Sequence, residues 1–151
     1  MEDPKSPEAI AARSSQEDPI VMYLIIRESL GMSLGKACAQ SGHVTMMMQI
    51  KYRELLDEHE HQALCGWGTP SDPAYLAIYK KWLDTSFRKV TLSADDKEWA
   101  KVKAELSADD IVIVEDAGLT EVPAGSETFI AVWPMYKSKR PRILKRLQAV
   151  K

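Results

Sequence analysis

The sequence predicts an α/β fold, a three-layer α/β/α sandwich around a four-stranded mixed sheet. Apolar runs typical of strands alternate with helical segments, which is the pattern of layered α/β domains. The last two predicted strands are joined by about ten residues, too few for a crossover helix, so this pair is expected to be antiparallel. With 151 residues, of which 45% are hydrophobic, the chain has enough apolar material for one domain with a core of its own.

The first third of the chain is expected to hold a leader, a strand and a long helix. Residues 1–18 are rich in Ser, Pro and acidic residues, and with so little to bury they predict a disordered N-terminal leader. A single domain is expected over residues 19–151. Residues 20–27, IVMYLIIR, predict a strand, and their near-continuous apolar character favours a central position with both faces covered. Residues 33–58 predict a long helix.

The next two elements follow a break in the pattern near residue 66, where glycine and proline cluster. Asp72 is the expected N-cap of a second helix, with Pro73 at its first position and an end near Thr85. The alternating segment FRKVTLSA, residues 87–94, predicts the second strand.

The last part of the chain predicts two further helices and two further strands. Ser93 is the expected cap of a helix over residues 94–106, whose first turn is acidic. Residues 110–116 and 127–134 predict the third and fourth strands. The tail, residues 137–151, is expected to form a final helix.

Charge is distributed unevenly, although the net charge is only −2. Residues 137–151 carry seven basic and no acidic residues, so a basic tail is joined to an acidic body. Such a tail indicates either nucleic-acid contacts or a solvated helix face. The two cysteines fit a reducing cytoplasmic location, and no stretch approaches the roughly 20 apolar residues that cross a membrane. We therefore expect no membrane partner.

The stretch GMSLGKACAQSGH, residues 31–43, follows the first predicted strand and has the layout of a phosphate-binding loop. A Walker A loop needs G-x-x-x-x-G-K-[ST]. Here Gly31 and Gly35 are one residue too close, and Ala37 stands where a metal-binding hydroxyl is required. The stretch is therefore not a nucleotide P-loop, but Lys36 still lies near a helix N-terminus, which favours an anion.

Helical spacing divides this predicted helix into two stripes. The stripe that should pack on the sheet consists of small and apolar residues, and the other stripe is mostly polar. The polar stripe either forms part of a site or is a solvent-exposed face of the helix. The apolar stripe is Ala37, Ser41, Val44 and Met48, and the polar one is Lys36, Gln40, His43 and Met47.

A second unusual stretch, EDAGLTEVPAGSET, covers residues 115–128. Asp116 lies at the carboxyl end of a predicted strand, and α/β folds tend to place their chemistry at the carboxyl ends of strands. If the first and third strands are parallel neighbours, Asp116 and Lys36 converge. The alternative is an ordinary hairpin with an Asx-type turn, in which Gly118 and Gly125 adopt unusual backbone angles.

Together, residues 35–43 (GKACAQSGH) and 116–134 (DAGLTEVPAGSETFIAVWP) resemble the type 2 peptidyl-tRNA hydrolase family. The family has the patterns G-K-x-x-A-Q-x-x-H and, before its last strand, D-A-G-R-T-Q-x-x-x-G-S-x-T. The resemblance covers roughly residues 20–150. It implies a cofactor-free enzyme that hydrolyses the ester between a peptide and the terminal ribose of tRNA, and that commonly forms a homodimer.

The resemblance also implies a site shared by the first helix and the hairpin loop. Asp116 is expected to orient or deprotonate a water, and Lys36 to stabilise the oxyanion or hold a phosphate. His43 is either a general acid or a hydrogen-bonding partner. The expected catalytic residues are Lys36, His43, Asp116 and Thr120. The expected substrate-binding residues are Gln40, Ser126 and Thr128, with Lys137 and Arg140 of the basic tail on the tRNA backbone; no metal is expected.

Three positions depart from the family pattern. The family usually has MGKGK where this chain has MSLGK, so Leu34 replaces a lysine. Leu119 stands in place of Arg, and Glu121 in place of Gln. Each change removes positive charge or adds negative charge at the expected phosphate-facing site. The alternative is therefore a non-catalytic relative that binds tRNA or a protein partner.

Overall fold

The computed structural model describes residues 5–8, 18–68, 71–119 and 121–151, so the expected leader lies almost wholly outside the described residues. These residues form one six-stranded mixed sheet with the order β3-β4-β1-β2-β6, and β5 is also paired to β1. Its strands are β1 (Ile20–Arg27), β2 (Lys89–Ala94), β3 (Ile111–Glu115), β4 (Glu127–Val132), β5 (Met135–Tyr136) and β6 (Gln148–Ala149). The mixed α/β class and the four expected strands are confirmed, but a four-stranded sheet is too small. The two added strands have two residues each, too short to show a period in the sequence.

Strand β1 lies inside the sheet, as its apolar sequence predicts. It pairs in parallel with β2 and antiparallel with β4, and its first residues pair with β5. Strands β3 and β4 are antiparallel, as their short connection predicts. The condition that we set for the convergence of Asp116 and Lys36, that the first and third strands are parallel neighbours, is not met, because β4 lies between β1 and β3.

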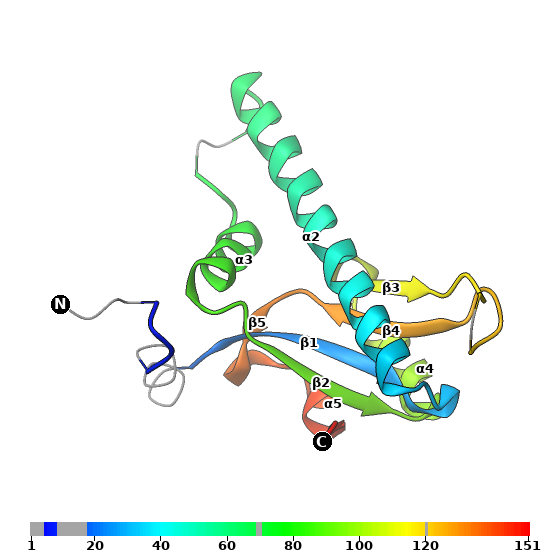
Figure 1. Cartoon of the computed structure of the whole chain (residues 1–151). Helices are drawn as coiled ribbons and strands as arrows, with labels where there is room; N and C mark the ends of the chain where they lie inside the picture. Colours follow the sequence, from blue (N-terminus) through cyan, green and yellow to red (C-terminus); the bar gives the residue numbers. More distant parts are fainter. Residues whose placement is uncertain (1–4, 9–17, 69–70, 120) are drawn as a thin grey trace.

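Within residues 18–68, 71–119 and 121–151, the α-helices that accompany the sheet are α2 (Leu34–Leu64), α3 (Ala74–Thr85), α4 (Asp96–Glu105) and α5 (Arg142–Arg146). Helix α2 extends beyond its expected end and rises well clear of the sheet (Figure 1). Pro73 occupies the N-cap position of α3, where Asp72 was expected. In the described part of the chain, no helix has both the length and the apolar character needed to cross a membrane.

The start of α4 corrects another expectation. Asp95 is its N-cap, and its carboxylate accepts the Glu98 N–H at 2.8 Å while the Glu98 carboxylate accepts the Asp95 N–H at 3.0 Å. This reciprocal capping box satisfies two free amides of the first turn. Ser93, the expected cap, is still part of β2 and pairs with Ile26 of β1 and with β6.

The basic tail is not a single helix. It consists of a 3-10 turn (Lys137–Lys139), the short helix α5 and strand β6. The turn is fixed by Asp18, whose carboxylate accepts the N–H and the hydroxyl of Ser138. At the other end, the Val150 N–H donates to the Thr91 carbonyl at 2.9 Å. These contacts hold the tail against the sheet, a placement that the basic charge of residues 137–151 does not predict.

The core consists of two clusters that share the alternating residues of β1. The cluster with Met22 and Leu24 packs against α2 and α3, and the cluster with Val21, Tyr23 and Ile25 packs against α4 and α5. Figure 1 shows α2 and α3 above the sheet as drawn and α5 below it. The site described next lies between α2 and the hairpin of β3 and β4.

Helix α2 buries a narrower stripe than its sequence predicts. Its buried residues are Gln40, Val44, Met48 and Tyr52. Val44 and Met48 are confirmed as core, whereas Ala37 and Ser41 lie half-buried beside the stripe. The residues of the expected polar stripe differ in their exposure to solvent: Gln40 is buried, and His43 and Met47 are exposed. The four-residue spacing of the buried positions brings Gln40 against the sheet.

Candidate active site

The Asp116 carboxylate is the centre of a buried polar cluster. Asp116 directly follows β3, and its side chain is only 4% exposed. Its Oδ1 accepts hydrogen bonds from Lys36 Nζ at 2.5 Å and from Gln40 Nε2 at 3.0 Å. Its Oδ2 accepts the Gly118 N–H at 2.7 Å. Both carboxylate oxygens therefore have donors, as a buried charge requires.

The start of α2 positions the two side chains that contact Asp116. Ser33 is the N-cap, and its hydroxyl accepts the Lys36 N–H at 3.3 Å. Lys36 consequently lies in the first turn, where the backbone amides favour a nearby anion. Gln40 is four residues further along, so both side chains leave the same face of the helix.

The loop after β3 positions Asp116 from the other side. The Asp116 N–H donates to the Ser126 carbonyl at 2.9 Å, and the Asp116 carbonyl accepts the Gly125 N–H at 2.8 Å. Gly118 has a positive φ of 75°, and a Cβ there would lie 2.4 Å from the Ala124 nitrogen. Only glycine fits where the loop folds back so closely. The bond from the Gly118 N–H to the Asp116 side chain is the expected Asx-type turn.

Thr128 extends the cluster into the sheet. Its hydroxyl donates to Gln40 Oε1 at 2.6 Å, and both residues are buried. Because Oε1 accepts from Thr128, the Gln40 amide is oriented with Nε2 toward Asp116. Thr128, Gln40 and Asp116 thus form a chain of hydrogen bonds in which every contact fixes the next.

The surroundings of Asp116 favour its charged form. The Lys36 hydrogen bond holds the pKa of Asp116 below its ordinary value, assisted by the Gly118 N–H and by the charges of Lys36 and His43, although burial opposes them. The carboxylate is therefore ionised at neutral pH. The pKa of Glu121 is also lowered, here by hydrogen bonds from the hydroxyl and the N–H of Ser33.

The structure brings together four of the residues expected from sequence: Lys36, Gln40, Asp116 and Thr128. Ser126 contributes its backbone carbonyl. His43 is exposed on α2 and affects Asp116 through charge. Thr120 lies outside the described residues. Among the residues that the structure describes, no group of three or more His, Cys, Asp or Glu side chains could hold a metal ion.

The two expected residues of the basic tail lie far from this cluster. The Lys137 N–H donates to the Pro19 carbonyl at 2.8 Å, beside the start of β1. The polar cluster lies beyond the other end of this strand, and eight extended residues span roughly 25 Å. Lys137 and Arg140 are therefore separate from the Asp116 cluster.

Two contacts of the site were missed from sequence, both between Ser33 and Glu121. The Ser33 N–H donates to Glu121 Oε2 at 2.9 Å, and the Ser33 hydroxyl donates to Oε1. Part of the signal was present, because a serine before a helical run is a cap candidate. Leu34 and Leu119 are 82% and 86% exposed, so two of the three departures from the family pattern lie on the solvent side of the cluster.

The comparisons with known proteins identify the family. The sequence model described as Peptidyl-tRNA hydrolase PTH2 matches residues 20–150. A peptidyl-tRNA hydrolase of Pyrobaculum aerophilum is 31% identical over 124 residues, covering 76% of this chain and 84% of the relative. Peptidyl-tRNA hydrolase 2 of Saccharomyces cerevisiae is 29% identical over 121 residues, covering 78% of this chain but 51% of the relative. The chain belongs to the peptidyl-tRNA hydrolase PTH2 family.

Proposed function

We propose that this chain hydrolyses the ester that joins a peptide to the terminal ribose of tRNA, and so recycles tRNA from stalled translation. One observation carries the proposal: an ionised, buried carboxylate, Asp116, is held by Lys36 and Gln40 from α2 and by Gly118 from its own loop. These residues belong to the two motifs that resemble the family. Family membership supports peptidyl-tRNA as the substrate.

The chemistry follows from the charges in the cluster. Water adds to the ester carbonyl carbon and gives up one proton to solvent, the bond to the ribose oxygen breaks, and that oxygen takes a proton, so the products are the peptide carboxylic acid and a free ribose hydroxyl. Because the pKa of Asp116 is lowered, its carboxylate is a weak base, suited to orient the water and to hold Lys36. The Lys36 ammonium supplies positive charge for the oxyanion. Gln40 and Thr128 keep the carboxylate in place.

The other expected residues take roles around this centre. Ser126 and Thr120 are proposed to donate hydrogen bonds to the ester carbonyl or the ribose. His43, on the exposed side of α2, is proposed to supply the proton to the leaving oxygen. Lys137 and Arg140, roughly a strand length away, are proposed to contact the tRNA backbone, because an acceptor stem is long enough to reach both places.

The surrounding organisation belongs to the same proposal. We propose a single domain over residues 19–151, built as a three-layer sandwich, since core clusters cover both faces of the sheet. We also propose a homodimer that acts in the cytoplasm, where its substrate is produced.

Release of an N-acetylated aminoacyl group from tRNA tests the proposed activity. Wild-type protein should turn over repeatedly, and Asp116→Asn should lose activity, because the amide cannot hold Lys36 as the carboxylate does. Asp109→Asn is the matched control: Asp109 is exposed in the 3-10 turn Ala108–Asp110, away from the cluster. Equal activity of the two variants would contradict the role of Asp116.

The alternative is a non-catalytic relative that binds tRNA or a protein partner. The exposed side chains of Leu34 and Leu119 favour it, because they leave the solvent side of the cluster without the family's cations. Under this alternative, folded wild-type protein would bind tRNA with salt-dependent affinity and would release no acyl group.

A further inference from the structure

Thr128 reaches Gln40 because β4 is irregular at this residue. Val114 pairs with Phe129, but the next residue of β3, Glu115, pairs with Glu127, and the register shifts between them. Thr128 is thus the extra residue of a β-bulge. Bulges are frequent next to active sites, where they redirect a side chain.

The bulge reverses the faces to which Thr128 and Glu127 point. Phe129 belongs to the core cluster on the α2 side, and Ile130 belongs to the cluster on the α4 side. Regular alternation from Phe129 would turn Thr128 toward α4 and Glu127 toward α2. Instead, the Thr128 hydroxyl contacts Gln40 of α2, and the Glu127 carboxylate contacts α4.

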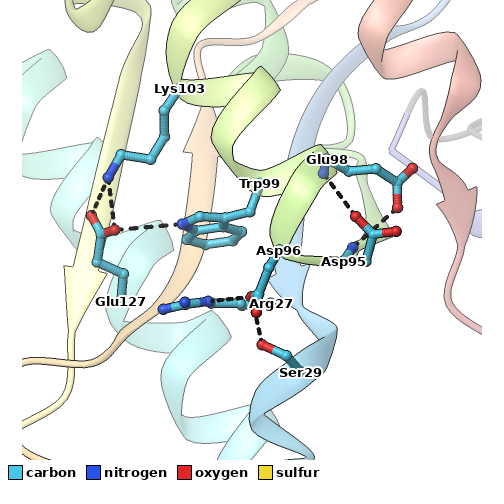
Figure 2. A network of polar contacts seen from close by, with 8 residues as sticks. All are labelled: Arg27, Ser29, Asp95, Asp96, Glu98, Trp99, Lys103 and Glu127. Carbon is cyan, nitrogen blue, oxygen red and sulfur yellow. Dashed lines mark hydrogen bonds and ion pairs between the residues drawn. The ribbon is translucent and has the colours of Figure 1, made fainter.

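Helix α4 holds Glu127 in this reversed position. Lys103 Nζ donates to Glu127 Oε1 at 2.7 Å and to Oε2 at 3.0 Å, and Trp99 Nε1 lies 3.5 Å from Oε1 (Figure 2). The carboxylate is partly buried, with 25% of the side chain exposed. The hydrogen bond from Lys103 is the main cause that lowers the pKa of Glu127. Glu127 therefore has charged and neutral donors on the α4 side.

The same helix is tied to the end of β1. The Arg27 guanidinium lies over the Trp99 ring, 5.9 Å from its centroid, and its Nε donates to Asp96 at 3.1 Å. The Ser29 hydroxyl donates to the same Asp96 oxygen at 2.7 Å (Figure 2). These contacts fix α4 relative to the strand end from which the chain continues to Lys36.

We propose that Lys103 and Glu127 are positioning residues for the hydrolytic site, acting from the opposite face of the sheet. Their ion pair holds the bulge, the bulge turns the Thr128 hydroxyl onto Gln40, and Gln40 in turn binds Asp116. Neither side chain touches the site itself, so their effect passes through Thr128. The kinetic part of this inference rests on the proposed function; the structural part does not.

Lys103→Met is the variant that tests it, with Lys101→Met as the matched control. Lys101 is an exposed lysine of the same helix, so both variants remove one positive charge from α4. Lys103→Met should lower kcat about tenfold with KM nearly unchanged, because a small displacement of catalytic groups has large kinetic effects. Lys101→Met should leave both constants unchanged. The exchanged pair, Lys103→Glu with Glu127→Lys, should recover most of the lost activity.

A spectroscopic readout makes the result independent of turnover. The side-chain amide resonance of Gln40, assigned by its loss in Gln40→Met, should move in Lys103→Met and stay in place in Lys101→Met. If wild type releases no acyl group, the proposed function fails, and this resonance still decides the inference. An unmoved resonance in Lys103→Met, or an equal shift in Lys101→Met, would overturn it. The inference would also be overturned if Lys103→Met lost activity only to the extent that its lower melting temperature explains.

Discussion

Replacing Thr128 with valine tests whether the bond between Thr128 and Gln40 holds the site together. Valine has nearly the shape of threonine, so the substitution removes a hydroxyl and leaves little cavity. The Thr128 hydroxyl is the donor for Gln40 Oε1 in the described part of the chain, at 2.6 Å, and both side chains are buried. Thr128→Val therefore leaves a buried amide oxygen without its donor.

The expected effect is a loss of stability and of activity together. A buried acceptor without a partner costs roughly 1–3 kcal/mol. We therefore expect the free energy of unfolding in urea to fall by about 2 kcal/mol with an unchanged m-value. We also expect kcat to fall about tenfold, because Gln40 is no longer oriented toward Asp116.

Thr45→Val is the control for this measurement. The Thr45 hydroxyl donates to the Ser41 carbonyl at 2.8 Å within α2, and that carbonyl keeps its helical bond from the backbone. The control should change stability by about 0.5 kcal/mol or less. If Thr128→Val changes stability no more than Thr45→Val and leaves kcat intact, the hydrogen-bond chain to Asp116 has no energetic role.

Three further substitutions have definite expected outcomes. Lys36→Met should lower kcat by about 10²–10³, and an NMR titration should show the pKa of Asp116 moving upward, since the lost hydrogen bond is the main cause that lowers it; an unmoved pKa would contradict this assignment. Because the pKa of Asp116 is lowered from 3.8, its ionisation stabilises the fold above about pH 3.8, and that stability is lost as pH falls through the native value. Asp116→Asn should therefore make the free energy of unfolding less dependent on pH below 4, and an unchanged acid profile would refute the charged state. Leu34→Lys should lower KM and steepen its salt dependence by a slope of about 0.7–0.9, as one added phosphate contact does; no change in slope would place residue 34 away from the tRNA backbone.

Much of the site could be predicted from the sequence because its residues lie in two short motifs. Lys36 and Gln40 are one helical turn apart, and Asp116 ends a strand, so both positions followed from local patterns. The convergence of Lys36 and Asp116 was predicted on the condition that the first and third strands are neighbours. The two side chains meet without that condition, because α2 crosses to the hairpin of β3 and β4, with β4 between β1 and β3.

The rest depended on contacts between distant segments. Alternation along β4 predicts Thr128 on the α4 side, and only the bulge, set by pairing with β3, turns it to α2. Ser93 has the sequence of a helix cap but is held in β2 by its strand neighbours. The basic tail forms no single helix because Asp18 and Thr91, far away in sequence, bind its two ends. Contacts between segments that are distant in sequence cannot be predicted from the structural propensities of single residues.

The most direct test of the proposed chemistry is a single-turnover measurement on N-acetyl-aminoacyl-tRNA with enzyme in excess. Binding of the same tRNA is measured in parallel, so that affinity and ester cleavage are separated. Wild type should cleave the bound ester, and Asp116→Asn should bind equally well but cleave at least about 10²-fold more slowly. Equal cleavage rates for the two proteins at saturation would contradict the role of the Asp116 cluster in catalysis.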